Sequence, residues 1–150
     1  RVEKGYTYGI RSGFNGSEYR GPFRISTSVQ SKITLEAAQS IVDIMENYGA
    51  SYSEADLATT RGYLIKSNAR SFESARAKLS LLDVCSSYGW TPDYIREREE
   101  IVESMTVKKI QELSARYLHM DRMIWVVVGD AATQKERRKE LGLGEVVWLN

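Results

Sequence analysis

The sequence predicts an α+β fold in which helices pack on one face of a mainly antiparallel sheet. Two strand-like segments open the chain, a block of helical segments follows, and two short apolar segments typical of strands come after it. Polar and apolar residues alternate in the opening part, whereas from about residue 34 the apolar residues recur at helical spacing. The 150 residues, 42% of them hydrophobic, suffice for one ordinary domain with one core, spanning residues 1–150.

The two opening strands are expected at about residues 6–14 and 22–30. The segment between them contains Asn15, Gly16, Gly21 and Pro22, which is typical of a hairpin or a long loop. In the second strand, apolar or threonine side chains alternate with polar ones, so one face should be buried and the other exposed. The alternating sets are Phe23, Ile25, Thr27 and Val29 against Arg24, Ser26 and Ser28.

Helices are expected from about residue 34. Thr34 is placed to cap the first helix, and Gly49 is placed to end it. Ser53 is followed three residues later by Asp56, which resembles a capping box and predicts the start of a second helical region. The apolar stripe of that region is interrupted near residues 68–71, so the region is either one kinked helix or two helices.

Two more helix starts follow Gly89, which is expected to close the second region. The segment Thr91-Pro92-Asp93 combines a capping oxygen, a proline at the first helical position and a carboxylate in the first turn. This helix should end near Glu103, and Thr106 can cap the next helix.

The last part of the chain should return to the sheet. Residues 122–128 are predicted to form a strand covered on both faces, because their apolar residues run without alternation. A short polar helix around residues 132–141 and a brief strand near residues 145–148 complete the expected fold.

Charge and hydrophobicity exclude several classes of partner. Lys and Arg total 21 and Asp and Glu total 20, so the net charge of +1 gives no general attraction to nucleic acid or anionic membranes. The longest strongly apolar run, residues 123–128, is far shorter than the roughly 20 residues that cross a bilayer. We therefore expect no nucleic-acid partner and no membrane span.

Metal-binding chemistry is not expected in this chain. His119 is the only histidine, so the chain cannot supply the two imidazoles of an H-x-x-E-H zinc motif. Arginines at positions 96 and 98 interrupt the acidic run Glu97, Glu99, Glu100 and Glu103, which is typical of a solvated helical face. Cys85, the only cysteine, cannot form an internal disulfide and is interpreted as a small buried hydrophobic residue.

The first eight residues carry the strongest functional signal. Arg1 and Tyr8 lie seven positions apart, which on a straight strand would separate them by roughly 23 Å and place them on opposite faces. Gly5 tolerates the backbone angles of a bend, and a bend would let guanidinium and phenol donate hydrogen bonds to one substrate carbonyl or oxyanion. Taken alone, the segment also fits a half-exposed strand whose tyrosines pack and whose arginine is solvated.

This opening resembles the R-x-x-x-G-x-x-Y element in the second half of pitrilysin/insulinase-type zinc peptidases, a group that includes the mitochondrial processing peptidases. Three further segments resemble that family in the same order: residues 23–30 its next strand, residues 69–73 its helix–helix junction, and residues 126–131 its late buried strand. The chain is thus similar to the C-terminal, zinc-motif-free half-domain of such a peptidase. That family has another strand and helices before the position matching Arg1, so the sequence is expected to be truncated at its start, with an unpaired sheet edge.

The resemblance implies the substrate-holding part of a zinc-dependent metalloendopeptidase that cleaves peptides or small proteins in a closed chamber. In that family's arrangement, Arg1 would orient a substrate carbonyl, Tyr8 would donate to the oxyanion formed by zinc-water attack, and Gly5 and Tyr6 would contact the substrate. A zinc-bearing half-domain or subunit of the same family would be the partner, and this chain would be inactive by itself. The sequence carries no clear address, and a bacterial periplasm or cell envelope is the expected location.

Two alternatives belong to other functional classes. The same fold also serves as a structural subunit without peptidase activity, and a sheet edge can bind extended peptides without cleaving them. An H-x-x-E-H motif in the same polypeptide or in a partner would favour the enzyme over both alternatives.

Overall fold

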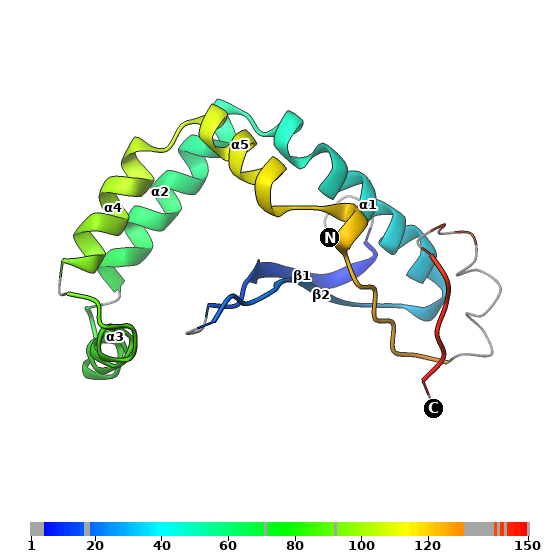
Figure 1. The fold of residues 1–150 in the computed structure, drawn as a ribbon, viewed down its shortest axis with the longest axis horizontal. Coiled ribbons are helices and arrows are strands. Elements are labelled where there is room, and N and C mark those ends of the chain that lie inside the picture. Colours follow the sequence, from blue (N-terminus) through cyan, green and yellow to red (C-terminus); the bar gives the residue numbers. More distant parts are fainter. Residues whose placement is uncertain are drawn as a thin grey trace. The chain divides into compact units, whose positions relative to one another are not determined.

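The α+β class with an antiparallel sheet is confirmed by a computed structural model, which describes residues 5–16, 19–70, 72–91, 93–130, 140, 142 and 144–149. Two strands come first and five α-helices follow (Figure 1). The elements are β1 Thr7–Phe14, β2 Phe23–Val29, α1 Thr34–Ser51, α2 Glu54–Arg70, α3 Ala75–Tyr88, α4 Tyr94–Ser104 and α5 Val107–Tyr117. Two single-turn 3₁₀ helices, η1 Ser31–Ile33 and η2 Met120–Arg122, flank the helical block.

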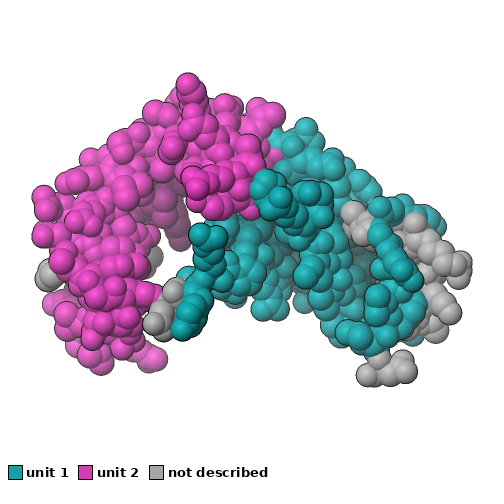
Figure 2. Space-filling view, in the orientation of Figure 1, with its two compact units in different colours: residues 1–47, 118–150 teal, residues 48–117 magenta. Residues whose placement is uncertain are grey.

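The chain divides into two compact units (Figure 2). Unit 1 comprises Arg1–Asn47 and Leu118–Asn150, and unit 2 comprises Tyr48–Tyr117. The division falls within α1, so the opening hairpin belongs to unit 1 and the helices α2 to α5 belong to unit 2. The expectation of one domain over residues 1–150 stays a prediction.

The opening hairpin of unit 1 is confirmed. β1 and β2 pair antiparallel (Figure 1). Phe14 opposes Phe23 at the closed end, with ring centroids 5.0 Å apart. The amide of Asn15 donates to the carbonyl of Pro22 at 3.1 Å, which continues the pairing into the connecting loop. Alternate residues of β2, from Phe23 to Val29, are half-buried and the others are exposed, as the sequence pattern predicts.

Helix α1 differs from the prediction at both ends. Gly49 does not end the helix, which continues to Ser51. Gly49 instead allows α1 and α5 to approach closely, because a Cβ at this position would collide with Ser114 Oγ of α5. Thr34 is not the N-cap, because it is the first residue of the helix, and its hydroxyl donates to the carbonyl of Ser31 at 2.9 Å. Within unit 1, the buried residues of α1 are Ala37, Ala38 and Val42.

The predicted capping box starts α2 in unit 2. The amide of Asp56 donates to Ser53 Oγ at 3.2 Å, and the amide of Ser53 donates to Asp56 Oδ2 at 2.9 Å. These two bonds satisfy amides that the first helical turn cannot pair internally. The hydroxyl of Ser53 also donates to Asp56 Oδ2, and these bonds hold the pKa of the carboxyl below its usual value.

Helices α2 and α4 lie side by side in unit 2 (Figure 1). The guanidinium of Arg61 donates to the carbonyls of Val102 and Met105, at 3.3 and 2.7 Å, where α4 ends. Those carbonyls have no partner within their own helix, so the positively charged guanidinium both caps the C-terminus of the helix and complements the helix dipole. The amide of Asn68 donates to Glu99 Oε1 at 2.8 Å and links the pair at a second point.

The region between residues 53 and 89 forms two helices rather than one kinked helix, because α2 ends at Arg70 and α3 begins at Ala75. Gly89 ends α3 as predicted, with a φ of 65° and its amide directed at the carbonyls of Cys85 and Ser86. Cys85 itself is half-buried.

Helix α4 begins two residues later than a cap at Thr91 predicts. Asp93 occupies the N-cap position without a side-chain capping bond, and the carbonyl of Thr91 accepts from the amide of Tyr94 at 3.1 Å. Stacked aromatic rings span the α3–α4 junction, with Trp90 4.7 Å from Tyr88 and 4.1 Å from Tyr94. The stacked rings help to stabilise this junction, where no side-chain capping bond is present.

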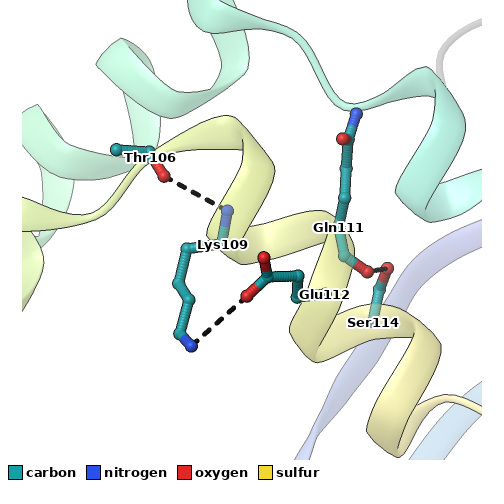
Figure 3. A network of polar contacts seen from close by, with 5 residues as sticks. All are labelled: Thr106, Lys109, Gln111, Glu112 and Ser114. Carbon is teal, nitrogen blue, oxygen red and sulfur yellow. Dashed lines mark hydrogen bonds and ion pairs between the residues drawn. The ribbon is translucent and has the colours of Figure 1, made fainter.

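Helix α5 starts at its predicted cap (Figure 3). Thr106 Oγ1 accepts from the amide of Lys109 at 3.2 Å, and the Lys109 ammonium lies 3.4 Å from Glu112 on the exposed side of the helix. Ser114 is buried, and its hydroxyl donates to the carbonyl of Gln111 at 2.9 Å. This serine is the residue against which Gly49 lies.

The predicted strands at residues 122–128 and 145–148 are wrong for the described structure, in which neither segment is a strand. Along residues 123–128, Met123 and Trp125 are half-buried, whereas Ile124 and Val128 are 89% and 95% exposed. The composition of a doubly covered strand is present, but nothing in the described residues covers both of its faces. The polar helix expected around residues 132–141 lies almost wholly outside the described residues.

Candidate functional site

The segment that carries the sequence prediction leads into β1. Gly5 has a φ of 62°, in the left-handed region that strains other residues, and no atom lies within 4 Å of a Cβ added to it. Tyr6 is half-buried and Tyr8 is exposed. Arg1 lies outside the described residues, so its convergence with Tyr8 stays a prediction.

An irregularity in β1 lies directly at Tyr8. Thr7 pairs with Val29 and Ile10 pairs with Thr27, so three steps along β1 match only two steps along β2. One extra residue is therefore inserted, and Tyr8 and Gly9 together oppose Ser28. This two-against-one arrangement is a β-bulge, a feature that bends a strand and re-aims a side chain.

The bulge decides which side chain lies over the half-buried face of the hairpin. Continuing the regular pairing from Ile10 and Thr27 would set Tyr8 opposite Val29, on the half-buried face of β2. With the extra residue, Thr7 takes the position opposite Val29 instead. Tyr8 is 97% exposed, and its hydroxyl makes no hydrogen bond to another described residue.

Two threonine hydroxyls hold the backbone at the bulge. Thr7 Oγ1 accepts from the amide of Gly9 at 3.1 Å and lies 2.8 Å from the carbonyl oxygen of Ser28. Thr27 Oγ1 lies 2.8 Å from Thr7 Oγ1 and 3.0 Å from the carbonyl oxygen of Gly9. Each hydroxyl has one proton to donate, so with Thr7 donating to Ser28, Thr27 can donate either to Thr7 Oγ1 or to the carbonyl of Gly9.

The chemistry available at this site is hydrogen-bond donation by a phenol. A tyrosine hydroxyl donates one hydrogen bond, so it can stabilise negative charge developing on a carbonyl oxygen. The phenol of Tyr8 is exposed and makes no hydrogen bond to a described residue, so its hydroxyl can bond to another molecule. The site can therefore bind and polarise a carbonyl group, but Tyr8 supplies no nucleophile or metal.

Sequence reasoning did not identify Thr7 or Thr27 as part of the site. The available signal was Gly9, since a glycine within a strand often marks a bulge and a threonine two residues earlier can bond to its amide. The register that reveals the bulge depends on Val29 and Thr27 of the other strand. The sequence of β1 alone does not predict that pairing.

Zinc does not fit the described part of this chain. Within the described residues, no group of three or more histidine, cysteine, aspartate or glutamate side chains lies close enough to hold a metal ion. Among the described helices, none combines the length and apolar character needed to cross a membrane.

Comparisons with known proteins bear on the fold. No family model matches the chain, and no curated protein sequence matches it. Among solved structures, the chain is similar to the crystal structure of a peptidase M16 inactive domain from Pseudomonas fluorescens, with a TM-score of 0.71 and 22% sequence identity. The match covers 79% of this chain and 28% of that chain, so this chain spans little more than a quarter of the neighbour's length. The likeness establishes that the chain has the α+β fold seen in a peptidase inactive domain.

Proposed function

We propose that this chain is the substrate-holding, non-zinc part of a zinc metallopeptidase of the pitrilysin/insulinase type. The observation that carries the proposal is Tyr8, an exposed phenol without a partner among the described residues, set on a β-bulge. The likeness of the fold to a peptidase inactive domain supports the same assignment. The zinc would belong to a separate domain or subunit of the same family, and the substrate would be a peptide or small protein.

In this proposal the residues of the chain bind and polarise the scissile peptide. Tyr8 donates its hydroxyl proton to the carbonyl oxygen as that oxygen gains negative charge, and Arg1 orients the same carbonyl. Tyr6 and Gly5 lie against the substrate backbone, where the left-handed φ of Gly5 turns the chain before β1. A donor placed before reaction costs no reorganisation when the charge appears, which is why its effect falls on turnover.

The test is Tyr8→Phe in the complete, zinc-containing protein. Removing one oxyanion donor is expected to lower kcat on the order of 10²- to 10³-fold while the zinc content stays the same. Tyr63→Phe is the matched control, since Tyr63 is another exposed tyrosine, 71% accessible and located on α2. Metal analysis and steady-state kinetics on a fluorogenic peptide measure both quantities.

The control should keep the kcat of the wild type. Unchanged kcat in Tyr8→Phe would remove this residue from the mechanism. Absence of any peptide cleavage by the zinc-loaded wild type would favour the structural subunit, and peptide binding without cleavage would favour the binding module.

A further inference from the structure

We infer that Thr7 is a positioning residue whose hydroxyl, together with that of Thr27, sets the β-bulge that keeps Tyr8 free to meet a substrate carbonyl. The inference rests on the proposed function, because it assigns Thr7 a role that acts through Tyr8. Thr7 would then affect turnover without contacting the substrate itself.

The first step of the argument is the competition between two registers. With a bulge, Thr7 lies opposite Val29, and without it Tyr8 would lie there. Because side chains alternate between faces, a shift of one residue moves Tyr8 from solvent to the half-buried face of the hairpin. Tyrosine has a high preference for half-buried strand positions, so the regular register is a real competitor.

The second step is what stabilises the observed register. A bulge interrupts the ladder, and polar backbone groups that lose their ladder partners destabilise a strand unless they find others. Here the amide of Gly9 and the carbonyls of Gly9 and Ser28 bond to threonine hydroxyls at 2.8–3.1 Å. Thr7 reaches all three of these groups, so its hydroxyl is the centre of the network.

The third step is that the network depends on the register itself. Only with Thr7 on the same face as Thr27 do the two hydroxyls come within 2.8 Å of each other. In the regular register Thr7 would lie on the opposite face, and its hydroxyl would lose Thr27. The hydrogen bonds of Thr7 therefore favour one register over the other rather than strengthening both.

The experiment compares Thr7→Val with Thr7→Ser in the complete, zinc-containing protein. Valine keeps the shape of threonine without the hydroxyl, and serine keeps the hydroxyl. Thr7→Val is expected to lower kcat on the order of 10²-fold, because the shifted register takes the phenol of Tyr8 away from the substrate carbonyl, whereas Thr7→Ser should keep most of the turnover. Thr59→Val, on an exposed threonine of α2, is the matched control and should keep wild-type turnover.

The same substitution in a Tyr8→Phe background separates positioning from general loss of stability. If Thr7 acts through Tyr8, Thr7→Val should reduce kcat no further once the phenol is absent. Independent, multiplicative losses from the two substitutions would overturn the inference. Equal turnover of Thr7→Val and wild type would also overturn it.

A structural readout distinguishes failure of this inference from failure of the proposed function. Nuclear Overhauser contacts of Val29 should change from Thr7 in the wild type to Tyr8 in Thr7→Val if the hydroxyl sets the register. If Tyr8→Phe leaves kcat unchanged, the proposed function fails, yet the contacts of Val29 still show whether Thr7 sets the bulge. A contact between the valine at position 7 and Val29 in the Thr7→Val variant contradicts the inference regardless of the kinetics.

Discussion

The sequence does not predict the role of single residues whose partner is distant along the chain. Gly49 has the position of a helix end, yet it lies within α1 and faces Ser114, a residue far along the chain. Thr7 reads as an ordinary strand residue, yet its hydroxyl reaches Thr27 and Ser28 of the other strand. In both cases the decisive neighbour is remote in sequence, so the local pattern alone could not identify the role.

Gly49→Ala and Gly62→Ala place the same methyl group on two helices. No atom lies within 4 Å of a Cβ at Gly62 in α2, so alanine there should raise the free energy of unfolding by about 1 kcal/mol through helix propensity. At Gly49 the methyl would displace Ser114 Oγ, and overpacking should make this variant about 1–3 kcal/mol less stable than Gly62→Ala. Urea unfolding of the two variants measures the difference.

Adding Ser114→Ala to Gly49→Ala removes the colliding oxygen and should recover much of the lost stability. Equal stabilisation by Gly49→Ala and Gly62→Ala would show that α1 and α5 do not approach each other closely at this point.

At the scale of elements, the sequence predicts those boundaries whose signals are local. Ser53 with Asp56, Gly89 and Thr106 each bond within their own turn, and each marks a helix end where the sequence predicts one. The strand pattern of β2 is equally local, because alternation along seven residues reports its two faces. The strand predicted at residues 122–128 is not a local signal of this kind. A strand that is covered on both faces needs other elements to pack against it, and the composition of the segment does not show whether they are present.

The contact between α2 and α4 depends on the two-pronged geometry of Arg61. Arg61→Ala removes the bonds to the carbonyls of Val102 and Met105 and should destabilise the protein by about 1.5–3 kcal/mol, the range for hydrogen bonds to charged groups. Arg61→Lys keeps the charge near the C-terminus of α4 but cannot span both carbonyls, so an intermediate loss is expected. Thermal unfolding measures both, with the exposed Arg76→Ala of α3 as control.

Full stability of Arg61→Lys would mean that only the charge matters at this position. A neutral Arg61→Ala would mean that the two carbonyls are satisfied without the guanidinium.

At the scale of the whole molecule, the fold class is predictable and the complete sheet is not. The order of strands and helices suffices for the α+β class, which the structure confirms. Yet residues 124, 126 and 128 are valines or isoleucine with 78–95% of their surface exposed, and the chain spans 28% of the length of its structural neighbour. Sequence signals describe what a segment prefers to pack against, but the packing partner must be supplied by other residues.

The proposed function likewise requires a second component, since it assigns Tyr8 to polarising a peptide and this chain has no histidine pair to hold zinc. The most direct test is a structure of the complete zinc-containing protein with a phosphinic peptide, whose tetrahedral centre mimics the attacked carbonyl. The account predicts that Tyr8, still on its bulge, lies with its hydroxyl oxygen about 2.5–3.0 Å from a phosphinate oxygen. A Tyr8 hydroxyl that points into bulk solvent, or that is enclosed by protein packing away from the inhibitor, would contradict it.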